Sequence, residues 1–387
     1  MGATPERERL ESAANDGRVI RWGPIVRAIF DAHLDLAWSG LFWNRDLALP
    51  LDQMRRAEAH MNDHPARGRA TVSLPELRRA NVAVCLATVL VRSKPQVSPA
   101  SGFNRRDLDY RNQTLACAIG QGHLAYYLLL EQQQHIRILR TQSDLAKHSK
   151  EFENAPQSCP IGVIIAMEGA DPIVSPEQAA MWWEQGLRCV GLAHYDQGPY
   201  ACGTGAAGSV TPQGLELLDE FKRLGIIVDL THTAEPGFFE VLDRFDGPVH
   251  ASHNMCRSLV SGDRQFSDEQ IRALLKRDAV IGMALDAWML KDGWVRGQTD
   301  RSTVSMQSVA DHIDHICQLA GDAKHVGIGS DLDGGFGTEQ CPADLDSIAD
   351  LQKLEPILES RGYSSDEIDG IFYANWLRFF SAALPRE

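Results

Sequence analysis

Short apolar runs alternate with amphipathic segments along most of the chain. Eight of these runs are apolar at most positions and rich in β-branched residues. That pattern is typical of strands in a parallel sheet that is covered on both faces. The strands predicted in this way are residues 25–31, 81–90, 161–167, 188–193, 226–231, 247–252, 279–285 and 325–330.

Start and stop signals predict helices between the strands. The Ser-Pro pair at 175–176 and the Thr-Pro pair at 211–212 each open a helical segment, and these segments end at Gly186 and Gly225. Ser267 precedes a capping-box pattern. Such signals mark helix termini. Longer helices are expected over residues 304–320 and 366–383, and a helical excursion over residues 109–139.

Strands that alternate with helices predict an α/β fold, here a (β/α)8 TIM barrel with a helical excursion after the second strand. An open doubly wound sheet is the alternative. No GxGxxG follows the first strand, so a dinucleotide-binding fold has no support. We expect one barrel domain over residues 1–387, with residues 1–24 as an N-terminal extension and residues 288–306 as a candidate lid.

Composition narrows the choice of partners. The formal net charge is −14, which argues against nucleic acid and anionic membranes. No apolar stretch is long enough to span a bilayer, and the N-terminus lacks the apolar core of a secretory signal. The eight cysteines show no CxxC spacing, so neither a zinc ribbon nor a disulfide framework is expected. A cytoplasmic protein with no nucleic-acid and no membrane partner is predicted.

A histidine or a carboxylate residue follows six of the eight predicted strands. The carboxyl ends of the strands carry the active site in a barrel, because the loops there converge on the axis. The residues at these ends are His33 and Asp35 after the first strand, Glu168 after the third, His194 after the fourth, His232 after the fifth, His253 after the sixth, and Asp331 and Asp333 after the eighth.

Such a gathering of imidazoles and carboxylates indicates a metal site. Desolvating several charges side by side costs several kcal/mol each unless a positive charge compensates, and divalent ions provide that compensation. Histidines and carboxylates without cysteine suit zinc or a similar first-row ion in a catalytic site. Two ions would need a bridging carboxylate, for which Glu168 is the best candidate.

The motifs AHLDL, AMEGAD, GLAHYD, VDLTHT, ASHN and IGSDLDGGFG together resemble the membrane/renal dipeptidase family, peptidase family M19 of the amidohydrolase superfamily. The likeness runs in order from about residue 28 to 380 and includes the C-terminal segment YANWLRFF. Members of that family are (β/α)8 barrels that hold two zinc ions. The resemblance therefore implies a zinc-dependent dipeptidase that hydrolyses the amide bond of a dipeptide by a metal-bridged hydroxide.

The resemblance also implies a role for each matching residue. His33 and Asp35 would bind the first zinc, Glu168 would bridge both ions, and His232 and His253 would bind the second. His194 matches the family histidine near the substrate carbonyl, Arg264 matches the arginine that binds the terminal carboxylate, and Asp331 matches the catalytic acid/base. The choice of Asp331 over Asp333 rests on the resemblance.

Three loops depart from the family pattern: YDQGPYACGTG after the fourth strand, ALDAWML after the seventh, and residues 334–346 after the eighth. These departures keep a second reading open, an amidohydrolase that acts on N-acyl amino acids or cyclic amides. A non-catalytic metal-binding barrel is a third. Trp38 and Trp43 either wall the pocket or pack in the core. A small-molecule dipeptide is the expected substrate, and a homodimer is left open.

Overall fold

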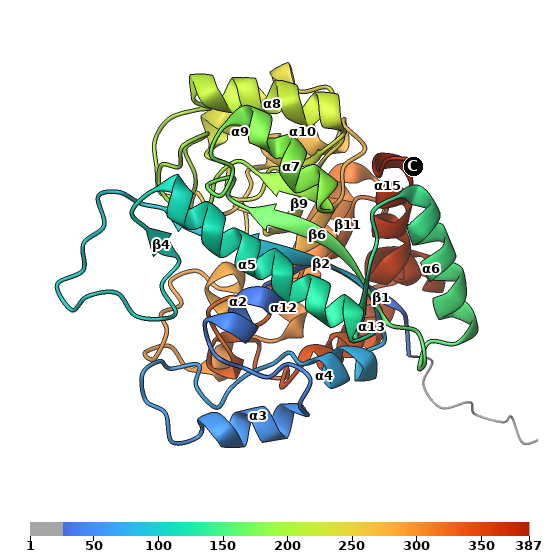
Figure 1. The fold of residues 1–387 in the computed structure, drawn as a ribbon. Helices are drawn as coiled ribbons and strands as arrows, with labels where there is room; N and C mark the ends of the chain where they lie inside the picture. Colours follow the sequence, from blue (N-terminus) through green and yellow to red (C-terminus); the bar gives the residue numbers. More distant parts are fainter. Residues whose placement is uncertain (1–25, 387) are drawn as a thin grey trace, which may run out of the picture.

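Eight parallel strands close into a barrel in the computed structural model, which describes residues 26–386 (Figure 1). The strand order is β2-β1-β11-β10-β9-β8-β7-β6, and β6 pairs back to β2. The predicted TIM barrel is confirmed; the predicted extension at 1–24 lies outside the described residues. The barrel strands are β1 (Ile29–Leu34), β2 (Val82–Leu90), β6 (Ile161–Glu168), β7 (Leu187–Gly191), β8 (Ile227–Asp229), β9 (Val249–Asn254), β10 (Ile281–Met283) and β11 (Val326–Ile328).

The strand bounds differ by a few residues from those predicted, and two differences are larger. The first strand was expected over 25–31 but is Ile29–Leu34, because its pairing with β2 begins at Ile29 opposite Val82. A short strand, β5 (Ile136–Ile138), occupies the end of the segment predicted to be helical, where it pairs with the start of β6. Three residues are too few to show a strand period.

The helices lie around the barrel and in the loops at its carboxyl end (Figure 1). The excursion after β2 holds β3 (Arg92–Ser93), β4 (Asp109–Tyr110) and α5 (Gln113–Gln132). The other helices are α2 (Leu36–Leu41), α3 (Leu51–Glu58), α4 (Leu74–Arg79), α6 (Gln142–Asn154), η2 (Pro176–Gln178), α7 (Ala179–Glu184), α8 (Pro212–Leu224), α9 (Glu235–Arg244), α10 (Asp268–Leu275), α11 (Ala287–Leu290), η3 (Arg301–Thr303), α12 (Met306–Ala320), η4 (Thr338–Gln340), η5 (Ile348–Lys353), α13 (Leu354–Ser360), α14 (Ser365–Asp369), η6 (Gly370–Ala374) and α15 (Asn375–Ala383).

Two of the three predicted helix start signals are present as capping hydrogen bonds, whereas Ser175 begins a short 3-10 helix without a side-chain cap bond. Thr211 caps α8 by accepting a bond from the Gly214 N–H, and the helix ends at Gly225 in the left-handed conformation. Ser267 and Gln270 form the predicted capping box at the start of α10. The segment predicted as one C-terminal helix is α14 and α15 joined by a π-helical turn.

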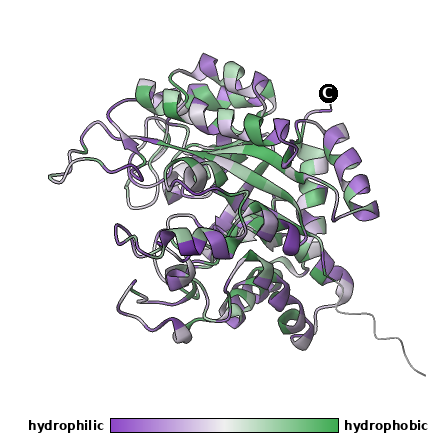
Figure 2. Cartoon of the chain, turned by 60° about the horizontal axis from the view of Figure 1, so that its bottom comes forward, coloured by the Kyte–Doolittle hydropathy of each residue, from purple (hydrophilic) through white to green (hydrophobic). Residues whose placement is uncertain are grey.

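Two apolar layers fix the barrel. Alternate residues of β6 divide between them: Val163 and Ile165 join the larger cluster, whereas Ile164 and Ala166 join a smaller one. The smaller cluster brings side chains of several strands together with Trp376 of α15. It therefore fills the interior of the barrel on the amino-terminal side of the polar residues. Figure 2 shows the strands as a predominantly hydrophobic centre within helices that carry hydrophilic residues.

The closing helix is tied to the barrel by polar bonds as well. The Asn375 amide donates to the carbonyls of Ala323 and Val326, at 2.7 and 2.8 Å. The Trp376 indole donates to the Ile328 carbonyl at 2.9 Å. The conspicuous C-terminal motif therefore seals the amino end of the barrel. Within residues 26–386, no helix combines the length and apolar character needed to cross a membrane.

Asp333 joins the loop that follows β11 to the long loop that follows β1. Its carboxylate accepts bonds from the N–H and hydroxyl of Thr71, both at 2.8 Å, and from the Val72 N–H at 3.1 Å. The Arg45 guanidinium lies 3.3 Å away and also pairs with Glu58. Both side chains of the Arg45–Asp333 pair are buried, so removal of Asp333 takes away one of the two carboxylates that compensate the Arg45 charge.

We expect Asp333→Ala to lower the free energy of unfolding by about 3–5 kcal/mol, because it leaves the buried N–H groups of Thr71 and Val72 without an acceptor and removes one of the two carboxylates that pair with Arg45. Denaturant unfolding measures this difference. Asp52→Ala is the matched control, since Asp52 pairs with Arg56 at the surface, where an ion pair contributes about 0–1 kcal/mol. Equal losses in the two variants would contradict the structural role of Asp333.

Candidate metal centre

The predicted site residues meet in one cavity at the carboxyl end of the barrel. The cavity has a volume of about 100 Å³. His33 is buried beside it, with its ring within reach of three of the carboxylates. The predicted residues that line the cavity are Asp35, Glu168, His194, His232, His253, Arg264 and Asp331.

Glu168 stands at the centre of this group, at the last position of β6. Its Oε1 lies 3.1 Å from His232 Nε2 and 3.3 Å from His253 Nε2. Its Oε2 lies 3.5 Å from His33 Nε2. The two oxygens of one carboxylate therefore face two different groups of side chains.

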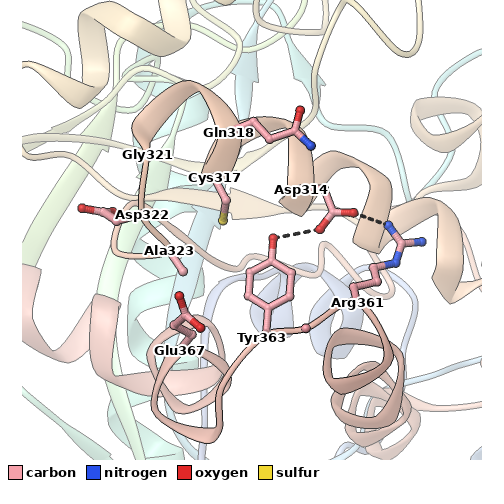
Figure 3. Close-up of a pocket in the computed structure, with 10 residues that line it drawn as sticks. Asp314, Cys317, Gln318, Gly321, Asp322, Ala323, Arg361, Tyr363 and Glu367 are labelled. Atoms are coloured by element: carbon pink, nitrogen blue, oxygen red, sulfur yellow. Dashed lines mark hydrogen bonds and ion pairs between the residues drawn. The ribbon is translucent and has the colours of Figure 1, made fainter.

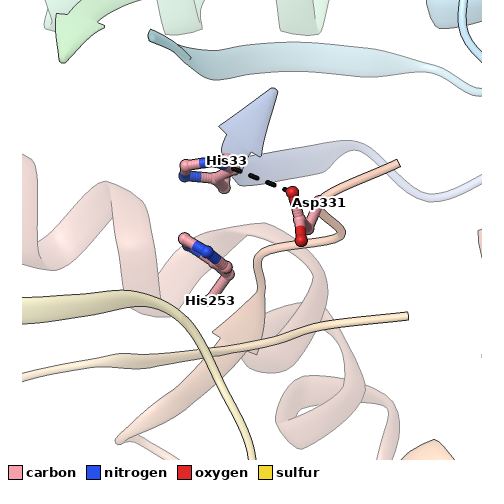
Figure 4. A group of neighbouring side chains, drawn as sticks. All are labelled: His33, His253 and Asp331. Carbon is pink, nitrogen blue, oxygen red and sulfur yellow. Dashed lines mark ion pairs between the residues drawn. The ribbon is translucent and has the colours of Figure 1, made fainter. Parts of the chain in front are cut away.

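The second group gathers around His33. Its Nε2 lies 3.9 Å from Asp35 Oδ1 and 3.8 Å from Asp331 Oδ1. Figure 4 shows that His33 and Asp331 come from opposite ends of the sequence, with the His253 ring beside them; the His33 and His253 ring centroids are 3.7 Å apart. Potential ligand atoms lie within 4.8 Å of one another in three sets: His33–Asp35–Glu168, Glu168–His232–His253 and His33–His253–Asp331.

These separations fit donor atoms that share a cation. Ligands bound tetrahedrally at about 2.0–2.2 Å lie about 3.4 Å from one another, and the distances around Glu168 and His33 run from 3.1 to 3.9 Å. The buried Nε2 of His33 has no hydrogen-bond partner among the described residues. A buried polar atom normally has one, so this nitrogen is suited to a metal ion.

The charges of the cluster also favour a cation. Burial lowers the pKa of His253 to about 3, so its ring is neutral near pH 7 and can offer an electron pair. Burial alone would lower the pKa of His33, but the carboxylates of Glu168 and Asp35 outweigh it and raise that pKa well above its usual value. Burial and repulsion from the same carboxylates raise the pKa of Asp331. A bound cation would stabilise these closely spaced carboxylates in their ionised form.

Hydroxyl groups orient three of the candidate ligands. The Thr204 hydroxyl lies 3.0 Å from His232 Nδ1, and the Ser252 hydroxyl lies 2.9 Å from His253 Nδ1. Thr88 donates to Asp35. Partners of this kind fix the ring orientation of metal-binding histidines. Thr204 belongs to the loop after β7, so one of the loops that depart from the family pattern supports the cluster.

Backbone conformation places two of the side chains. His232 and Asp331 have φ values of 64° and 57°, in the left-handed region that few non-glycine residues adopt. Two glycines make room for neighbouring atoms, one in a side chain and one in the backbone. A Cβ at Gly334 would lie 2.0 Å from Asp331 Oδ1, and a Cβ at Gly203 would lie 1.9 Å from the His194 carbonyl oxygen.

The structure separates Asp331 from Asp333. Asp331 lines the cavity and faces His33, as the resemblance implies. Asp333 takes part in the loop contacts with Thr71 and Arg45 described above. Two carboxylates that are two residues apart thus have different surroundings.

His194 and Arg264 line the cavity beside the cluster. His194 Nε2 lies 3.7 Å from Glu168 Oε1, and burial lowers its pKa to about 3. The Arg264 guanidinium is buried and donates one bond, to the His253 carbonyl at 2.9 Å. Its other terminal nitrogen has no partner among residues 26–386. Arg264 therefore lines the cavity with a cationic N–H donor group that has no partner in the described part of the chain.

The cavity wall also contains residues that the sequence did not single out, among them Tyr195, Asp286 and Trp288. Asp286 directly follows the segment predicted as the seventh strand, residues 279–285, so the rule of polar residues at strand ends would have found it. Trp38 lines the cavity as well. Trp43 instead packs against arginine side chains, with Arg45 4.7 Å from its ring centroid.

A second pocket, of about 420 Å³, lies beside the C-terminal end of α12 (Figure 3). Its wall includes Ala323, just before β11, so it lies at the amino end of the barrel. Its principal polar groups already bind one another: Asp314 accepts bonds from Tyr363 at 2.8 Å and Arg361 at 2.6 Å. These contacts leave the cavity at the carboxyl end as the better candidate site.

Comparison with known proteins agrees with this geometry. The family model for membrane dipeptidase (peptidase family M19) matches residues 26–384. Dipeptidase verJ of Clonostachys rogersoniana is 30% identical over 239 residues, which cover 60% of this chain and 58% of that protein. Dipeptidase 3 of Macaca fascicularis is 25% identical over 346 residues, which cover 86% of this chain and 68% of that protein. The match thus spans little more than half of the former relative.

Solved structures share the fold. A protein described as the dipeptidase AC, a metallopeptidase, superposes with a TM-score of 0.75 at 20% identity, covering 93% of this chain and 99% of the other. A metallopeptidase from Rhodobacter sphaeroides, solved with a phosphinate mimic of the dipeptide L-Ala-D-Ala, superposes with a TM-score of 0.73 at 19% identity, with the same coverage. The match of the family model over nearly the whole chain shows that this protein belongs to the membrane dipeptidase family, peptidase family M19.

Proposed function

We propose that this chain is a metal-dependent dipeptidase that holds two zinc ions and hydrolyses the amide bond of a dipeptide. The observation that carries the proposal is the placement of Glu168. One of its oxygens faces His232 and His253, and the other faces His33. A carboxylate placed in this way is suited to bridge two ions.

The donor set suits zinc at both positions. His33 and Asp35 would hold the first ion with Glu168, and His232 and His253 would hold the second with the same carboxylate. Imidazole and carboxylate ligands without thiolates are those of catalytic zinc sites. When bound, a pair of divalent ions polarises a carbonyl and lowers the pKa of water toward neutrality.

Asp331 and His194 are placed to move protons and to stabilise charge. Asp331 lines the cavity 3.8 Å from His33, where its carboxylate would take the proton of the attacking water and pass it to the leaving amine. His194 lies on the Glu168 side of the cavity. Its ring would donate toward the oxygen that gains negative charge as the amide carbon becomes tetrahedral.

Arg264 would bind the carboxylate at the substrate's C-terminus. Its guanidinium is fixed by the bond to the His253 carbonyl and keeps an unpaired terminal nitrogen. Planar guanidinium groups bind carboxylates through paired N–H donors. A substrate held there would place its amide bond beside the metal cluster.

The named relatives support this substrate class, since several carry the name dipeptidase and one neighbour was solved with a dipeptide mimic. An amidohydrolase acting on N-acyl amino acids or cyclic amides is the alternative, because such an enzyme would use the same barrel and ions. A panel of L,L- and L,D-dipeptides beside N-acyl amino acids distinguishes the two. A non-catalytic barrel would hydrolyse none of them. Cytoplasmic location and a homodimer stay predictions.

We expect the purified protein to carry about two zinc equivalents and to lose hydrolysis on chelation, with recovery when zinc is restored. Elemental analysis and a dipeptide assay measure both. Glu168→Gln, which keeps the volume of the side chain, is expected to lower the zinc content. One bound ion, or none, after reconstitution of the native chain would exclude the binuclear site.

We expect Asp331→Asn to retain its fold and most of its metal but to lose about 10²–10⁴-fold in kcat, the range for loss of a general acid/base. Steady-state kinetics and zinc analysis on the same preparation separate the two effects. Asp322→Asn, at a partly exposed turn before β11, is the control for a lost carboxylate. Unchanged turnover in Asp331→Asn would remove the proposed proton transfer.

We expect Arg264→Ala to raise KM for dipeptides with a free C-terminal carboxylate by about 10- to 100-fold, since a hydrogen bond to a charged group contributes about 1.5–3 kcal/mol. C-terminal amides of the same dipeptides should change little. Arg264→Lys keeps the charge but loses the planar fork, so an intermediate effect is expected. If both substrate types weaken equally, the residue does not select for the carboxylate.

A further inference from the structure

Asp286 is a buried carboxylate in the wall of the substrate cavity, on the loop directly after β10. Its two oxygens each lie 2.8 Å from the Gln340 amide nitrogen. The Trp288 indole N–H donates to Oδ2 at 2.8 Å. Side chains from two loops therefore fix its position.

The bonds to Asp286 are all from uncharged donors. Gln340 and Trp288 are neutral, and no lysine, arginine or histidine pairs with Asp286 in the described part of the chain. The nearest cation acts through Gln340, because Arg296 donates to the Gln340 amide oxygen. A buried carboxylate without an opposite charge is costly, and burial raises the pKa of Asp286 to about 7. A cationic group in the cavity would stabilise its ionised form.

Asp286 shares the cavity with Arg264 and the metal cluster. All three line a volume of about 100 Å³, so a ligand that contacts two of them also lies near the third. Their charges differ: Arg264 is cationic, whereas Asp286 adds an anionic group outside the candidate ligand set. A dipeptide carries matching charges, a carboxylate at one end and an ammonium group at the other.

We propose that Asp286 binds the free α-ammonium group of the substrate's amino-terminal residue, and that it thereby restricts hydrolysis to substrates with an unblocked amino terminus. This inference rests on the proposed dipeptidase function and deepens it. An ammonium group offers three donors, and a charge-assisted bond to a desolvated carboxylate is among the stronger hydrogen bonds in proteins. N-acyl amino acids lack that charge and would leave Asp286 unpaired.

The residues that hold Asp286 in place are themselves joined by hydrogen bonds. Gln340 lies in η4 of the loop after β11, and Arg296 lies in the loop after β10. Arg296 also donates to the Gly335 carbonyl at 3.2 Å. The two loops are thus joined to each other as well as to Asp286, so the carboxylate keeps its place without a ligand's help.

The test compares Ala-Ala with N-propionyl-alanine, which replaces only the ammonium group by hydrogen, on the zinc-loaded enzyme. We expect the native chain to prefer Ala-Ala by about 10- to 100-fold in kcat/KM, and Asp286→Asn to lose most of that preference through a higher KM for Ala-Ala. Activity of Asp286→Asn toward N-propionyl-alanine should stay the same or rise.

Asp300→Asn removes an exposed carboxylate from the same loop and serves as the matched control, with both activities expected to stay unchanged. Equal losses for both substrates in Asp286→Asn would overturn the inference, as would a native enzyme that hydrolyses both compounds equally well. The second comparison needs no variant, so it holds even if Asp286→Asn fails to fold. Failure of the native enzyme to hydrolyse either compound would instead exclude the proposed function.

Discussion

The position of the Glu168 carboxylate is the constraint on which the site depends. β6 pairs with β2 on one side, where Glu168 lies opposite Leu90, and with β7 on the other. Both neighbours are needed to hold the last residue of the strand at the centre of the cavity. The histidines that face Glu168 come from different strands or from the loops after them. Their distances to Glu168 therefore depend on the register of the strands in the closed barrel. A slip of one residue would turn the carboxylate into the surrounding apolar layer.

Much of this arrangement was predictable because it follows local rules. A strand in a covered sheet must be apolar on both faces, so the eight barrel strands stand out in the sequence. Every side chain at a strand's carboxyl end then faces the same region, which is why His33, His194 and His253 could be grouped before any contact was known. The missed strand β5 is too short for a pattern.

The remaining features depend on contacts between distant segments. Asp331 and Asp333 have the same chemistry and nearly the same position in the chain, and only the placement of Arg45 and Thr71 distinguishes them. The hydroxyl of Thr204 meets His232 because the loop after β7 folds back over β8. Hydrogen-bond partners of this kind have no spacing rule, so sequence patterns do not reveal them. Asp286 is different, since the strand-end rule applied to β10 would have included it.

Two parts of the site are therefore held in place in different ways. Strand ends and the residues next to them supply the candidate metal ligands, and the barrel register fixes their distances. The loops supply the outer wall, and each is fastened by its own buried polar contact: Thr204 to His232, Asp333 to Arg45, and Gln340 to Asp286. A loop fastened in this way can change its cavity-facing residues while the cluster keeps its geometry. Differences between this chain and the family pattern fall in those loops, so we infer that they alter the choice of substrate more than the chemistry of amide hydrolysis.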